Sequence, residues 1–190
     1  RAWQLLADCG LLPHLWPKAG WTAAETDAIA TLLGRLPAGA AFELTLAVTL
    51  GARDDAEVER VGRALTLSNE QLDNVRWLVA NQAALDEPEA PTLAALKRLM
   101  AHRMFPALCD WAQARYAERT DQVTRQAALE ARIAAIPPEA VQPAPFVRGD
   151  DLKARGIAPG PVYAELLDAL YTRQLGETLQ TRENALAALD

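Results

Sequence analysis

A glycine- and proline-rich turn near the end of the chain is the first place where the sequence could bind a ligand. Gly156 and Gly160 flank this turn and Pro161 follows it, so one helix is expected to end at Gly156 and another to begin after Gly160. Lys153 and Arg155 stand just before the turn. Exposed backbone N–H groups and the positive end of a helix dipole suit a phosphate group. The alternative is a tight connection between two helices that binds nothing.

A set of basic residues in the middle of the chain is the second candidate. Lys97 and Arg98 are followed at four or five positions by His102 and Arg103, so parts of this set are expected to project together on the polar side of a helix. Such a face can bind the phosphates of a nucleic acid. It can equally be an ordinary solvated helix face.

Residues able to bind a metal or move a proton are sparse. His14 and His102 have no partner His, Asp or Cys at the spacing of metal ligands. Two pairs of adjacent aspartates, at 54–55 and 150–151, stand where helix N-caps are expected, and we interpret them as structural. The sequence therefore predicts no catalytic residue and no metal site in this chain.

The charges are unevenly distributed along the 190 residues, whose net charge is −6. Residues 1–90 carry 7 basic and 13 acidic groups, residues 91–136 carry 7 and 4, and residues 137–190 carry 5 and 8. Affinity for nucleic acid comes largely from Lys and Arg neutralising phosphates, so the total charge argues against such a partner. The basic middle segment is the one stretch that favours it.

The composition is that of a globular chain, with 51% hydrophobic and 23% charged residues. No apolar run approaches the ~18 residues of a membrane span, and no charged and apolar leader is present, so a cytoplasmic protein without a membrane partner is expected. Cys9 and Cys109 lie far apart and are predicted to be buried, reduced thiols. Arg1 stands in place of an initiator methionine, which favours a piece of a longer protein.

Local signals predict helices throughout. Thr22 with Glu25 and Ser68 with Gln71 have the spacing of capping boxes. The leucine-rich stripe over residues 29–36 repeats at helical spacing and is expected to face the core.

The stretch 40–50 is apolar almost all round, which predicts an interior helix that ends at Gly51, and Asp54 or Asp55 is expected to start the next helix. No segment alternates with period two, so we expect no strands. The five tryptophans could stack on bases, but their positions on apolar helix faces and beside caps favour packing.

Four segments, taken in order, form a pattern that covers nearly the whole chain. WQLLADCGLLPHLWP opens it at residues 3–17, LTLSNEQLDNVRWLVAN follows at 65–81, and LAALKRLMAHRMFPALCDW at 93–111. The last segment, residues 146–186, contains GDDL, GIAPGP, QLG and TRENAL. This ordered set resembles the C-terminal body and tail of bacterial tRNA nucleotidyltransferases, the CCA-adding enzymes, and of the related poly(A) polymerases.

The resemblance implies an all-α fold with a multi-helix body, a proline-rich linker and a small helical-hairpin tail. Four prolines within residues 136–147 place the linker, because proline fixes φ and removes a backbone donor. The expected divisions are the end of a neck-like helix at 1–20, the RNA-binding body at 21–136, the linker at 137–148 and the tail at 149–190.

The resemblance also implies an RNA-binding role. The parent enzymes add nucleotides to an RNA 3′ end with CTP or ATP and magnesium ions, in an N-terminal head whose Gly-Ser and D-x-D motifs we do not find here. This chain is expected to be non-catalytic, to hold no cofactor, and to grip the backbone of tRNA or another RNA. The expected RNA-binding residues are Lys97, Arg98, His102, Arg103, Arg125, Arg132, Lys153, Arg155 and Gly160.

Several alternatives stay open at this point. The parent enzyme could add CCA, CC, A or a poly(A) tail. The choice stays open because the neck region that selects the nucleotide is not found in this sequence. The expected partners are RNA, the N-terminal catalytic head and a second copy of the chain in a homodimer. The rival interpretation, favoured by the acidic total charge, is a helical scaffold for protein interaction or dimerisation that does not contact RNA. A helical phosphohydrolase is remote, because it would need a His-Asp metal site.

Overall fold

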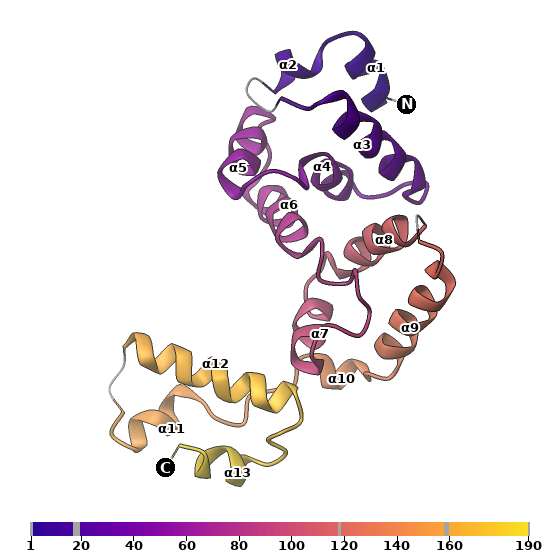
Figure 1. Ribbon diagram of the computed structural model, residues 1–190. Helices are drawn as coiled ribbons and strands as arrows, with labels where there is room; N and C mark the ends of the chain where they lie inside the picture. Colours follow the sequence, from indigo (N-terminus) through magenta and orange to yellow (C-terminus); the bar gives the residue numbers. More distant parts are fainter. Residues whose placement is uncertain (1, 17–19, 118, 158–159, 190) are drawn as a thin grey trace. The chain divides into compact units, whose positions relative to one another are not determined.

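The structure is a computed structural model that describes residues 2–16, 20–117, 119–157 and 160–189 (Figure 1). Within these residues the chain forms thirteen helices and no strand, which confirms the predicted all-α fold. In the same ranges no helix is both long enough and apolar enough to cross a membrane.

The chain forms two compact units, each built from two stretches of sequence. Unit 1 comprises Arg1–Pro88 and Met104–Ala127, and unit 2 comprises Glu89–Arg103 and Ala128–Asp190. Unit 1 contains α1 (Ala2–Asp8), α2 (Leu12–Leu15), α3 (Ala23–Arg35), α4 (Phe42–Leu50), α5 (Asp55–Ala64), α6 (Asn69–Asn81), α8 (Phe105–Tyr116) and the start of α9 (Gln122–Ala134). Unit 2 contains the rest of α9 with α7 (Leu93–Met100), α10 (Pro138–Val141), α11 (Gly149–Ala154), α12 (Pro161–Leu175) and α13 (Arg182–Ala187).

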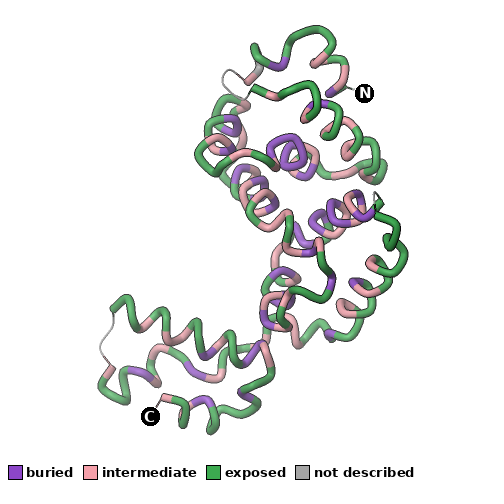
Figure 2. Tube along the Cα trace, in the orientation of Figure 1, coloured by how far each residue is buried: buried purple, intermediate pink, exposed green. Residues whose placement is uncertain are grey.

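Helix α4 is the centre of unit 1, as its apolar sequence predicts. It packs against α3, α6 and α8, and its residues from Leu44 to Leu50 are buried except Thr45 (Figure 2). Leu78 of α6 and Trp111 of α8 are also almost completely buried. Three neighbouring helices thus cover this apolar helix of nine residues and remove its side chains from water.

The predicted caps are confirmed. Thr22 and Glu25 make a reciprocal capping box at α3, and Ser68 and Gln71 make one at α6. The Asp54 side chain accepts from the backbone N–H of Glu57 and so begins α5. Each side chain satisfies backbone donors that a helix leaves unpaired in its first turn.

Replacing Ser68 by alanine is expected to lower the free energy of unfolding by about 1 kcal/mol, because the first turn of α6 loses its acceptor. Urea denaturation followed by circular dichroism measures this. Ser68→Asp is the matched control, since an aspartate at the N-cap restores the acceptor. Equal losses in both variants would show that the cap does not stabilise α6.

The stripe over residues 29–36 faces the neighbouring helices but is only half-buried, so the expectation that it lies in the core is met in part. An apolar cavity of about 680 Å³ lies beside it, lined in part by Leu33 of α3, Leu36 just after α3, Phe42 and Leu46 of α4, and Trp3 of α1. The side chains of α3 therefore border open space where a core was expected.

Three tryptophans near the start of the chain pack on one another. The rings of Trp3 and Trp21 meet edge to face with centroids 5.1 Å apart, and Trp16 lies 5.5 Å from Trp21. The Trp3 indole donates to the carbonyl of Thr26, and the Trp21 indole donates to that of Thr49. These contacts join α1 to α3 and the residues before α3 to α4, so the tryptophans have the packing role that was predicted.

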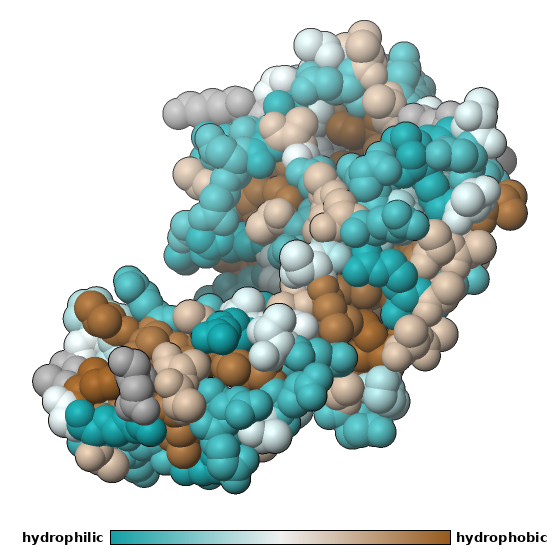
Figure 3. Space-filling view, turned by 60° about the horizontal axis from the view of Figure 1, so that its bottom comes forward, coloured by the Kyte–Doolittle hydropathy of each residue, from teal (hydrophilic) through white to brown (hydrophobic). Residues whose placement is uncertain are grey.

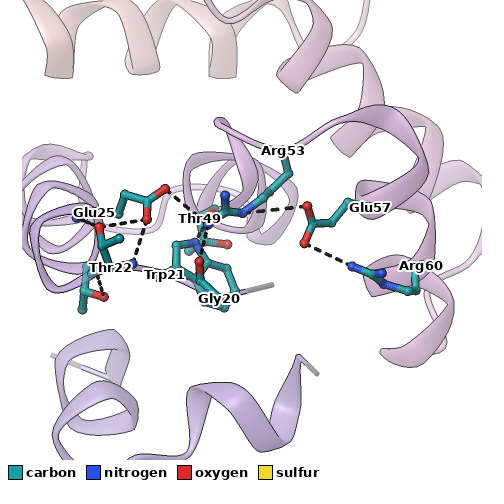
Figure 4. A network of polar contacts seen from close by, with 9 residues as sticks. Gly20, Trp21, Thr22, Glu25, Thr49, Arg53, Glu57 and Arg60 are labelled. Carbon is teal, nitrogen blue, oxygen red and sulfur yellow. Dashed lines mark hydrogen bonds and ion pairs between the residues drawn. The ribbon is translucent and has the colours of Figure 1, made fainter. Parts of the chain in front are cut away.

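Arg53 holds the starts of α3 and α5 together (Figure 4). Its guanidinium lies 3.4 Å from a Glu25 carboxylate oxygen and 4.0 Å from one of Glu57. It also lies over the ring of Trp21, 5.4 Å from the centroid. Hydrogen bonds from Thr22 and the charge of Arg53 keep the pKa of Glu25 below its usual value, so this carboxylate is charged at neutral pH.

The two cysteines differ from the expectation. Cys9 is exposed, so its predicted burial is wrong, while Cys109 is half-buried in α8. Burial raises the pKa of the Cys109 thiol to about 12, which keeps it protonated and unreactive at neutral pH. Both are free thiols.

In unit 2 the tail helices enclose a small core of their own. Val147, Leu152, Leu170, Leu179 and Ala185 form it, drawn from α11, α12, α13 and the segments beside them. This continuous apolar cluster explains how the two short helices α11 and α13 hold to the longer α12 at the end of the chain.

The predicted helix limits of the tail are confirmed. Gly149 begins α11, Gly156 follows it with φ of +79°, and Gly160 with Pro161 begins α12. The hydroxyl of Tyr163 donates to the carbonyl of Gly149, where a side chain in place of the glycine would meet the ring. Residues 158–159 of the predicted hairpin lie outside the described residues.

The proline-rich stretch is not wholly extended. It contains the single turn α10, which begins with Pro138 at the first helical position, where proline costs no hydrogen bond. This turn packs against α7. Helix α7, which the sequence places in the body, therefore packs with helices of unit 2, including α12.

Candidate nucleic-acid interface

Lys97 does not lie on the polar face that the sequence predicts. Its side chain is only 4% exposed, and its ammonium lies 2.9 Å from a carboxylate oxygen of Glu177, which follows α12. Glu177 is a non-glycine residue in the left-handed region, with φ of +60°. The predicted projection of Lys97 is wrong, because the helix phase could not reveal a carboxylate 80 residues further along the chain.

Arg98 lies on the same helix but reaches solvent. Its guanidinium donates to Asp168 at 2.6 Å and to the hydroxyl of Thr172 at 2.9 Å, and it lies over the ring of Tyr171. These three residues belong to α12, so Arg98 joins α7 to α12. Its side chain remains 41% exposed, which leaves part of the guanidinium open to a further acceptor.

His102 and Arg103 follow α7 directly. Burial lowers the pKa of the half-buried His102, so its imidazole is neutral at pH 7 and offers no charge to a phosphate. Arg103 is exposed. Of the four basic residues predicted to act together, Arg98 and Arg103 are the two that present charge to solvent.

The two arginines predicted on the helix before the linker, α9, lie in different units. In unit 1, Arg125 binds Asp121 at 2.8 Å and Glu87 at 2.5 Å, and its side chain is 14% exposed. These carboxylates raise its pKa. In unit 2, Arg132 donates to the carbonyl of Pro91 at 2.6 Å.

Lys97 and Arg132 are brought together in unit 2. Both line a cavity of about 280 Å³, which is bordered by Glu177 and by Leu93 and Ile136. The cavity holds two cations and one carboxylate within a mainly apolar wall. Lys97 is already paired with Glu177, and Arg132 already donates to the Pro91 carbonyl. We therefore interpret this arrangement as a structural contact that holds helices of unit 2 together.

The tail presents its predicted cations openly. Lys153 pairs with Asp150 at 3.2 Å on the exposed surface of α11, and Arg155 is exposed at the end of that helix. Gly160 is exposed and begins α12. The space-filling view shows hydrophilic and hydrophobic side chains interspersed on the visible face of the tail (Figure 3). A surface ion pair such as that of Lys153 is weak, so a phosphate can replace its carboxylate partner.

Sequence reasoning missed a group of arginines at the end of α8. Arg115 pairs with Asp86 at 2.8 Å, and Arg119 pairs with Asp121 at 3.4 Å and with Glu87 at 3.6 Å. The available signal was the four-residue spacing of Arg115 and Arg119 together with adjacent carboxylates at 86–87.

The described residues contain no group of three or more His, Cys, Asp or Glu side chains placed to hold a metal ion.

Comparisons with known proteins support the fold alone. No protein-family profile matches the sequence, and no curated protein matches it. Among solved structures, the chain is similar to the Thermotoga maritima CCA-adding enzyme complexed with tRNA, with 18% sequence identity and a TM-score of 0.51. The likeness covers 98% of this chain and 47% of that one, so this chain spans about half the length of the enzyme whose fold it shares.

Proposed function

We propose that this chain is the RNA-gripping body and tail of a tRNA nucleotidyltransferase or poly(A) polymerase. The observation that carries the proposal is the fold likeness over 98% of the chain to an enzyme solved with tRNA. The ordered sequence motifs support the same assignment independently. A fold alone does not define a function, so the proposal depends equally on surfaces able to bind phosphate.

Exposed cations in unit 2 are the proposed contacts. Arg98 and Arg103 lie at and after the end of α7, and Lys153 and Arg155 lie at the end of α11. Arginine and lysine on a helical surface bind the RNA backbone without reading its sequence, because an A-form helix offers phosphates and 2′-hydroxyls to them. Recognition by backbone and shape is what a protein that holds every tRNA needs.

Catalysis is assigned elsewhere under this proposal. A nucleotidyltransferase head, supplied by an N-terminal segment, would use magnesium and CTP or ATP, and this chain would present the RNA to it in the cytoplasm. A homodimer would be compatible with this role.

The electrostatic contribution to binding is expected to be modest. Lys97 and Arg125 are committed to carboxylates, and unit 1 is acidic. With three or four phosphates contacted, the logarithm of the association constant is expected to fall against the logarithm of salt concentration with a slope of about −3.

A titration of labelled tRNA with the purified chain at low and moderate salt tests the proposal. Arg103→Glu is expected to weaken binding about tenfold, since it replaces an attraction to phosphate by a repulsion. Arg63→Glu is the control, because Arg63 is also an exposed arginine but lies on α5 in the acidic part of unit 1, whereas Arg103 lies in the turn between α7 and α8. Absence of binding at low salt would overturn the proposal. The rival interpretation, a helical scaffold for protein interaction, would then remain, and sedimentation would measure whether the chain associates with itself.

A further inference from the structure

A second cavity in unit 1 is bordered by arginines that the proposed contacts do not include. It has a volume of about 280 Å³ and lies between α3 and the end of α8. Its lining residues are Ala28, Leu32, Asp86, Arg115, Tyr116 and Arg119. The wall is apolar on the α3 side and polar on the other, which suits a small charged group held from one side.

The guanidinium of Arg115 is only partly satisfied in this cavity. Its Nε lies 2.8 Å from Asp86 Oδ1 as an ion pair, without the alignment of a hydrogen bond. Its Nη2 is buried and has no hydrogen-bond partner among the described residues. A buried guanidinium N–H without an acceptor is costly, and native proteins nearly always supply one.

The neighbouring groups do not supply that acceptor. The Tyr116 hydroxyl donates to the carbonyl of Leu85, and burial raises the pKa of Tyr116 to about 12, so the hydroxyl keeps its proton. The ring of Trp111 lies under the guanidinium, with its centroid 5.3 Å from Arg115 Cζ, and offers no hydrogen-bond acceptor. Arg115 therefore keeps one buried N–H without an acceptor among the described residues.

Arg119 supplies a second cation at the mouth of the cavity. Its side chain is 45% exposed, and its ion pairs with Asp121 and Glu87 are long, at 3.4 and 3.6 Å. Exposed pairs of this kind exchange partners readily. Arg119 can therefore turn toward an anion that enters beside Arg115.

We propose that this cavity binds a phosphate group, held by the guanidinium groups of Arg115, whose side chain is 21% exposed, and of Arg119, both of which line the cavity. The planar fork of arginine matches the oxygens of a phosphate, and two arginines can neutralise its charge. The carboxylate of Asp86 orients the Arg115 guanidinium through their ion pair. Its negative charge also repels the phosphate, so it weakens phosphate binding. The phosphate can be a phosphodiester of an RNA backbone, in which case the site rests on the proposed function, or a free phosphate.

The first arm of the test uses inorganic phosphate with the full chain. Nuclear magnetic resonance of the arginine side-chain N–H groups is expected to show saturable shifts at Arg115 and Arg119, with none when chloride is added to equal ionic strength. Asp86→Asn is expected to tighten phosphate binding about tenfold, because it removes the opposing charge. Arg119→Gln is expected to weaken it about tenfold, and Arg60→Gln, at an exposed helix position in unit 1, serves as the control.

A purely structural role of Arg115 predicts a different result. Asp86→Asn would then loosen α8 and leave phosphate without effect on either arginine, which would overturn the site. Arg119→Gln keeps the proposal testable if variants at Arg115 or Asp86 do not fold, because Arg119 is half-exposed.

The second arm repeats the tRNA titration with Arg119→Gln. Weaker tRNA binding together with phosphate shifts supports a backbone phosphate in the cavity. Phosphate shifts without any tRNA binding support a free phosphate and overturn the proposed function. If Arg119→Gln binds tRNA as tightly as the wild type and phosphate shifts no arginine resonance, the cavity site is overturned. The proposed function is unaffected by that result.

Discussion

Replacing Lys97 by glutamate is expected to cost about 3–5 kcal/mol of unfolding free energy, the range found when one partner of a buried ion pair is removed. The new carboxylate would be buried where Lys97 is 3% exposed, close to the carboxylate of Glu177. The buried charge would have no cation beside it, and the carboxylate of Glu177, which is 62% exposed, would repel it. Urea denaturation followed by far-ultraviolet circular dichroism measures the loss.

Lys97→Met is the matched control. Methionine keeps the length and the apolar contacts of the lysine stem and leaves Glu177, which is 62% exposed, to be hydrated. Its unfolding free energy is expected to lie within about 1.5 kcal/mol of the wild type, since an apolar replacement of similar volume is tolerated. A Lys97→Glu protein as stable as the wild type would show that the side chain is not buried. Weakened tRNA binding by Lys97→Glu would carry no information on RNA contact, because the variant disturbs the fold.

Replacing Trp111 by alanine is expected to lower the unfolding free energy by about 3–5 kcal/mol, the usual cost of truncating a buried aromatic side chain. Trp111 is 2% exposed, its ring packs against Gly51 at the end of α4, and Arg115 lies over it. The cavity left behind would border the central helix of unit 1. The shift of the urea midpoint measures the effect.

Leu5→Ala is the control for Trp111→Ala. Leu5 is 62% exposed, so its truncation removes little contact and is expected to change the unfolding free energy by less than about 0.5 kcal/mol. Equal stability of Trp111→Ala and Leu5→Ala would contradict the placement of Trp111 in the core.

The sequence predicted best those features that neighbouring residues determine. The capping boxes at Thr22 and Ser68 need only a hydroxyl and a carboxyl or amide three positions on, and both formed. The interior position of α4 follows from its continuous apolar composition. Helix limits at Gly156 and Pro161 likewise depend on local backbone preference.

The features that the sequence did not reveal depend on residues far away along the chain. Lys97 is buried because Glu177 reaches it, and a helical projection contains no such information. The proposed phosphate site at Arg115 depends on two features of the tertiary structure, an Nη2 without a hydrogen-bond partner among the described residues and the cavity that Arg115 lines. The stripe on α3 was assigned to the core because periodicity identifies an apolar face but not what covers it.

The positions of the tryptophans have a consequence for how the unfolding of this protein can be followed. All five, at 3, 16, 21, 77 and 111, lie in unit 1, and unit 2 has only Tyr163 and Tyr171 as phenolic chromophores. Indole fluorescence therefore reports on unit 1 alone, whereas circular dichroism reports on the helices of both. One optical signal thus follows unit 1 and the other follows both units, so coincidence of the two transitions tests whether the units unfold together.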